Sequence, residues 1–91
     1  MNMYALNKLC YRVVREPELR QQLAEAPEPA LRAASPPLAE EEIAALLAGD
    51  VGRLSLMGAN HFLLHQLARF RLFGLDLPLY ADRIRAAYRE L

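Results

Sequence analysis

Apolar positions recur every three or four residues along almost the whole chain, a spacing typical of amphipathic α-helices. The first such stripe predicts a helix over residues 3–15, and it consists of Leu6, Leu9, Cys10, Val13 and Val14. Pro17 cannot continue that helix but suits the first turn of another, so we expect a short second helix through Leu19 and Leu23, ending near Pro27. We find no alternating strand pattern and no internal repeat.

Turn and cap residues divide the middle of the chain. Residues 27–37 include four prolines and predict a turn, one helical turn around residues 30–34 and an extended linker. The segment LAEEEIAALLAGD, from Leu38, predicts a helix with an acidic first turn, and Gly49 suits the left-handed position at its end. Asp50 is then expected to cap a short helix through residues 51–57, closed by Gly58.

Two further helices are predicted in the last third. Asn60 is a suitable N-cap for the segment HFLLHQLARFRLF, which we expect to run as one helix until Gly74. Pro78 opens the final helix, whose apolar stripe consists of Leu77, Tyr80, Ala81, Ile84, Ala87, Tyr88 and Leu91. The sequence therefore predicts an all-α fold, a compact cluster of about five to seven short helices, as a single domain over residues 1–91 with a proline-rich connection around residues 27–37.

Composition narrows the classes of partner. Hydrophobic residues make up 54% of the 91 residues, somewhat more than a small soluble domain needs for its core, so part of the surface is expected to face a partner. Eleven basic and eleven acidic residues leave no net charge, which disfavours nucleic-acid binding. No apolar run approaches the roughly 18 residues of a membrane span, and no signal peptide is visible. The single cysteine fits a reducing cytosol, so we expect a cytoplasmic protein with no membrane partner.

No catalytic set can be assembled from the sequence. Cys10 lies on an apolar helix face and is predicted to be a buried, inert thiol. Ser35 and Ser55 lie outside any GxSxG context, and the four glycines are dispersed rather than grouped in a phosphate loop. The acidic run at residues 40–42 is expected to be a solvated first turn, because consecutive helical residues point in different directions. We therefore predict no catalytic residues in this chain.

His61 and His65 have the four-residue spacing at which one helix face can present two metal ligands. Zinc or iron would need at least a third ligand, and Phe62 occupies the position where a zincin carries glutamate. No other histidine or cysteine can complete the set, although an acidic residue from elsewhere in the fold could. We predict no metal site and no cofactor in this chain, with an autonomous metalloenzyme as an alternative.

Apolar side chains surround most of the circumference of the helix after Asn60. They are Phe62, Leu63, Leu64, Leu67, Phe70, Leu72 and Phe73. A helix of this kind is either buried centrally or covered by a second surface. Both interpretations, a core helix and a core helix with one partner-facing side, stay open.

The ordered combination of LNKLCYRV at residues 6–13, EEEIAALLAGDVGRL at residues 40–54 and GANHFLLHQLARFRLFGL from Gly58 resembles one family. It is similar to the small α subunit of the protocatechuate 4,5-dioxygenase type of extradiol ring-cleavage enzymes, the LigA family. The resemblance extends from about Leu6 to Arg85. It implies a helical component that binds a larger β subunit, whose two histidines and one glutamate hold Fe(II) for opening a catecholic ring.

The resemblance also implies where such a subunit would act, because the α component of this family caps the mouth of the β active site. The positions expected at the edge of the partner or of the substrate pocket are Asn60, His61, Phe62, His65, Phe70 and Phe73. Longer family members carry a loop after the segment that corresponds to Gly58–Phe70, and that loop contributes an aromatic contact near the substrate. This chain is shorter there.

The leading hypothesis is thus a non-catalytic α subunit of an extradiol dioxygenase in aromatic catabolism, with the catalytic β subunit as partner and its Fe(II) in that partner. The alternative is an orphan module of the same fold that binds another protein or peptide. A homo-oligomer is also left open.

Overall fold

Helix boundaries follow the proline, glycine and cap residues of the sequence. The structure is a computed structural model that describes residues 3–89, and within this range the chain forms seven α-helices and a short 3-10 turn, with no strand. The elements are α1 (Tyr4–Arg15), α2 (Pro17–Glu25), α3 (Pro27–Arg32), α4 (Glu40–Leu47), α5 (Val51–Leu56), α6 (His61–Arg69), η1 (Leu72–Gly74) and α7 (Leu77–Arg89). The predicted all-α cluster of short helices is confirmed. None of these helices is long and apolar enough to cross a membrane.

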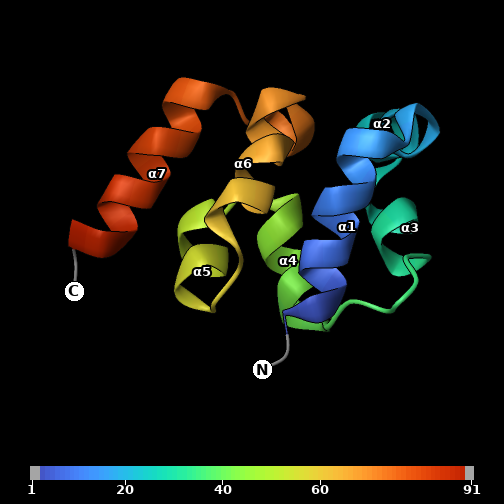
Figure 1. The fold of residues 1–91 in the computed structure, drawn as a ribbon, viewed down its shortest axis with the longest axis horizontal. Coiled ribbons are helices and arrows are strands. Elements are labelled where there is room, and N and C mark those ends of the chain that lie inside the picture. The colour runs from blue at the N-terminus through green and yellow to red at the C-terminus, as the bar shows by residue number, and fades with distance from the viewer. Residues whose placement is uncertain (1–2, 90–91) are drawn as a thin grey trace.

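Helix α6 lies in the middle of the molecule and contacts α1, α5, α7 and η1 (Figure 1). At one end of the molecule α3 lies against α2 and α4, and at the other α7 lies against α5 and α6. The shared core is mostly leucine, and its most deeply buried side chains include Leu6, Leu31, Leu54, Leu64 and Leu67. The prediction that the helix after Asn60 is central to the core is therefore confirmed.

The inner face of α1 is formed by Leu6, Leu9, Cys10 and Val13, as predicted. Val14, assigned to the same stripe, is instead exposed, because one residue further along a helix turns the side chain by roughly 100° away from the core.

The proline-rich segment is more helical than expected. A turn was predicted from Pro27, but α3 begins at that residue, with the proline in its first turn. Proline is favourable there because its backbone has no N–H to satisfy and its φ is already helical. The extended connection is confined to residues 33–39 and includes a cis bond between Ser35 and Pro36.

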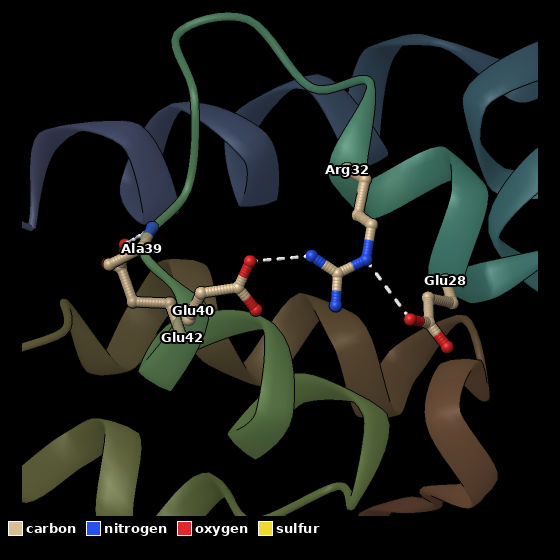
Figure 2. Close-up of polar contacts among 5 residues, drawn as sticks. All are labelled: Glu28, Arg32, Ala39, Glu40 and Glu42. Atoms are coloured by element: carbon tan, nitrogen blue, oxygen red, sulfur yellow. Dashed lines mark hydrogen bonds and ion pairs between the residues drawn. The ribbon is translucent and has the colours of Figure 1, made fainter.

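Polar contacts hold the end of α3 to the beginning of α4 (Figure 2). Arg32 donates to Glu28 at 3.0 Å and to Glu40 at 2.6 Å. The hydrogen bond from Arg32 lowers the pKa of the Glu40 carboxyl. All three side chains are exposed, so the pairs orient the connection more than they stabilise it.

Glu42 corrects the expectation that the whole acidic run at residues 40–42 is solvated. It is only 2% exposed, and its Oε1 accepts the backbone N–H of Ala39 at 2.7 Å (Figure 2). A glutamate at the third helical position folds back onto the residue before the helix, where it satisfies an amide that the helix leaves unpaired.

The helix predicted to continue to Gly74 ends at Arg69 instead. Arg71 and Phe73 both adopt left-handed backbone conformations, with φ of 57° and 56°; Arg71 immediately precedes η1 and Phe73 lies within it. In a continuous helix Phe73 would lie on the side opposite Leu64 and face away from the core. Breaking the helix buries Leu72 and Leu75 and packs Phe73 against the core, which offsets the cost of the unusual backbone.

The last helix is less buried than its clean stripe predicts. In α7 only Tyr80 is buried, Ile84 and Ala87 are half-buried, and Leu77 and Tyr88 are exposed. The remaining member of the stripe, Leu91, lies outside the described residues. Helix α7 is less buried because it lies at the edge of the cluster and has neighbouring helices on one side (Figure 1).

Candidate functional site

The N-terminus of α6 is fixed by two asparagines. Asn60 caps the helix as predicted, because its Oδ1 accepts the backbone N–H of Leu63 at 3.1 Å. Its own backbone N–H donates to Oδ1 of Asn7 on α1, also at 3.1 Å. The start of α6 is therefore held both by its own cap and by a neighbouring helix.

A small polar cluster lies next to this cap. Nε2 of His61 contacts the hydroxyl of Ser55 on α5 and lies 3.3 Å from the phenol of Tyr88 on α7. The Ser55 and Tyr88 oxygens are 2.7 Å apart. Three helices thus meet through one imidazole and two hydroxyl groups, which can exchange donor and acceptor roles among themselves.

His65 points to a different neighbour. Its ring meets the edge of Tyr80 with centroids 5.4 Å apart and an interplanar angle of 81°. The Tyr80 phenol donates to the backbone carbonyl of His61 at 3.3 Å, and burial is the main cause that raises the pKa of that phenol.

The two histidines therefore do not converge on one point, although they share a helix. Within residues 3–89 no three histidine, cysteine, aspartate or glutamate side chains lie together in a group that could hold a metal ion. An Fe(II) site of the two-histidine, one-carboxylate type does not fit the donors that this part of the chain provides.

Exposed apolar side chains flank the polar cluster. Phe62, next to His61, is 77% exposed, and Leu56, next to Ser55, is also exposed. Tyr88 is 42% exposed. We call the set formed by Leu56, His61, Phe62 and Tyr88 the α6 surface. Apolar and aromatic groups gathered around a polar centre are typical of a protein-binding surface.

A shallow groove between α5 and α7 adjoins this surface. Leu56 lines it together with Gly52, Ala86 and Ala87, with Arg53 and Arg83 among its charged side chains. Gly52 lets the two helices approach closely, since a Cβ there would lie 2.8 Å from both Cβ of Ala87 and the carbonyl oxygen of Arg83.

Phe70 and Phe73 lie apart from the α6 surface, at the opposite end of α6. Phe70 is half-buried beneath the guanidinium of Arg20, whose Cζ is 4.4 Å from the ring centroid. Phe73 packs against the hydrophobic core. The six positions expected at a partner or pocket edge thus divide into two groups, and only Asn60, His61, Phe62 and His65 lie together.

The sequence does not mark Ser55 and Tyr88 as site residues. Ser55 lies in no nucleophile motif, and Tyr88 belongs to an apolar stripe. The two residues are 33 positions apart in the sequence, so no local spacing pattern connects them. Cys10 behaves as predicted, because burial raises the pKa of its thiol to about 12 and so keeps it protonated.

Comparison with known proteins identifies one family. The model of the family described as aromatic-ring-opening dioxygenase LigAB, LigA subunit, matches residues 6–82. This range includes Ser55, His61 and Phe62, and it ends before Tyr88. Neither the curated proteins nor the solved structures include a significant match to the chain.

Proposed function

This chain belongs to the LigA subunit family of aromatic-ring-opening dioxygenases, and we propose that it is the non-catalytic α subunit of such an enzyme. In this role it docks on an iron-containing β subunit and caps its active site. The single observation that carries the docking role is the α6 surface, where a 77% exposed phenylalanine adjoins an imidazole fixed by two other helices.

The geometry supports an indirect role in ring cleavage. The α6 surface is anchored to α1 by the Asn60 amide and to α5 and α7 by the His61 ring. A rigid lid of this kind can exclude water from a partner's active site and order the loops around it. Phe62 would insert into the partner, while His61 and Tyr88 would supply polar contacts around it.

The metal is proposed to lie in the partner. Fe(II) activates a catecholic substrate and dioxygen in enzymes of this type, and its protein ligands leave coordination positions open for both. Because His61 and His65 are directed to different neighbours, we propose that this chain binds the β subunit and shields its active site from water.

Co-expression with a β-type dioxygenase encoded beside this gene tests the proposal. We expect the two chains to co-purify and the β subunit to cleave a catecholic substrate faster with its partner than alone. A Phe62→Ala variant should weaken the complex, whereas Leu77→Ala, which removes an exposed apolar side chain from the first turn of α7, should not. If the chains neither co-purify nor alter ring cleavage, the proposal is wrong and the family fold serves another partner.

A further inference from the structure

The outer face of α1 carries alternating tyrosine and cationic side chains. Tyr4, Lys8, Tyr11 and Arg15 follow one another at spacings of four, three and four residues. In a helix with about 3.6 residues per turn these spacings place all four on one side, opposite the buried stripe of α1. We call this set the α1 stripe. All four side chains are exposed, Tyr4 by 60% and Tyr11 by 45%.

The cations of the α1 stripe are arranged around an aromatic ring. Nζ of Lys8 lies 5.8 Å from the Tyr11 ring centroid, and Cζ of Arg15 lies 5.3 Å from it. Arg15 also donates to the Tyr11 hydroxyl at 3.0 Å. These contacts preorganise a flat aromatic group between two positive charges. Tyrosine and arginine are the residue types most enriched where protein interfaces gain their binding energy.

The charged residues of helix α1 are all positive. Helix α1 has no acidic residue, and its remaining cation, Arg12, is paired with Glu16 at 2.8 Å. In the part of the chain that the structure describes, neither Lys8 nor Arg15 is paired with a carboxylate. A complementary surface would supply carboxylates beside apolar groups that cover the two tyrosines.

The α1 stripe borders the α6 surface. Asn7 lies between Tyr4 and Tyr11 on α1, and its side chain accepts the backbone N–H of Asn60 immediately before His61. We infer that the two surfaces form one continuous interface, and that an acidic segment of the same β subunit covers the α1 stripe. This inference rests on the proposed function and adds the chemistry that the partner must have. A protein partner is favoured over nucleic acid because the chain has no net charge and the stripe offers only two cations.

Charge reversal in the co-expressed complex provides the test. A Lys8→Glu, Arg15→Glu variant should weaken the complex with the neighbouring β-type dioxygenase by at least about tenfold and reduce the salt sensitivity of association. A matched control with the same change in net charge, Arg69→Glu together with Arg71→Glu, alters exposed arginines outside α1 that likewise pair with no carboxylate among the described residues, and it should leave the affinity within about twofold. Thermal unfolding followed by circular dichroism checks that both variants are folded.

The outcomes separate the inference from the proposed function. A complex that forms with the wild-type chain and tolerates the Lys8 and Arg15 reversal overturns the inference alone. Equal weakening by both charge-reversed variants overturns it as well, because the effect would then report net charge. No complex with the wild-type chain overturns both. Retention on immobilised DNA that depends on Lys8 and Arg15, without an effect on the complex, would assign the α1 stripe to a polyanion instead.

Discussion

The phenol oxygen of Tyr88 lies 2.7 Å from the Ser55 hydroxyl, and this contact joins the last helix of the chain to α5. Helix α7 lies at the edge of the cluster, where it packs against α5 and α6, and Tyr80 is its one buried residue within Leu77–Arg89. The Ser55–Tyr88 pair, with His61 beside it, is therefore expected to contribute to stability as well as to the α6 surface.

Replacing Tyr88 with phenylalanine tests this contribution. The ring is retained and the hydroxyl is lost, which leaves the buried Ser55 hydroxyl with one partner fewer, so the free energy of unfolding should fall by about 1 kcal/mol. Urea unfolding measures the change. Tyr11→Phe is the matched control, because its hydroxyl bonds only an exposed arginine, and it should change stability by less than about 0.5 kcal/mol. Equal losses in the two variants would contradict the assigned role of Tyr88.

The cap of α6 can be tested by substitutions at Asn60. Asn60→Ala removes the acceptor for the Leu63 amide and should lower the free energy of unfolding by about 1 kcal/mol. Asn60→Asp keeps an oxygen in the same place and should be nearly neutral. Chemical denaturation of both variants provides the measurement. A similar loss for alanine and aspartate would show that the cap is not the source of the effect.

The close crossing of α5 and α7 depends on Gly52. Gly52→Ala would place a methyl group 2.8 Å from both the Ala87 methyl and the Arg83 carbonyl oxygen, so one helix must move. We expect a loss of roughly 1–3 kcal/mol in the free energy of unfolding, as for other overpacked sites. Adding Ala87→Gly removes one of the two clashes, so the double variant should lose less stability than the sum of the Gly52→Ala and Ala87→Gly single variants. Additive losses would place the clash entirely at the Arg83 backbone.

The left-handed residue after α6 predicts a stabilising substitution. Arg71 has a φ of 57°, a conformation that glycine adopts without steric cost. Arg71→Gly should therefore leave stability unchanged or raise it by up to about 1 kcal/mol. Ala44→Gly, within helix α4, should instead lower stability by about 1 kcal/mol. Thermal melting of the two variants distinguishes them, and a loss of stability in Arg71→Gly would argue against the helix break.

Burial of Cys10 predicts a pH dependence. Its thiol has a pKa of about 12 in the folded chain against an ordinary value of 9.0, so between these values the unfolded chain binds fewer protons. The contribution of this group to stability is thus fully present below pH 9 and is lost as the pH rises towards about 12.

A Cys10→Ala variant isolates this effect. It is expected to be less stable than the wild type at pH 8, because a buried side chain becomes smaller, but the difference should shrink as the pH rises above 9. Urea unfolding at several pH values measures that difference. A thiol reagent at pH 8 should react with the wild type only after unfolding, and fast reaction with the folded chain would be inconsistent with the buried state.

The sequence by itself determined the local structure. Proline at the start of α2, asparagine and aspartate at the N-caps of α6 and α5, and glycine after α4 each act on their own backbone neighbours. Such effects depend on few residues, so they can be inferred without knowing the fold. The inner face of α1 and the family resemblance of the segment GANHFLLHQLARFRLFGL from Gly58 can likewise be inferred from the sequence alone.

Only the tertiary structure decided the features that depend on distant residues. Helix α6 ends at Arg69, and the break lets Phe73 pack against the core that the other helices form, beside the buried Leu72 and Leu75. Tyr88 is half-exposed because, within residues 3–89, α7 packs against α5 and α6 on one side only, and it meets Ser55 across 33 positions of sequence. The α6 surface arises from this packing, because its aromatic and polar groups come from three helices that local patterns cannot place together.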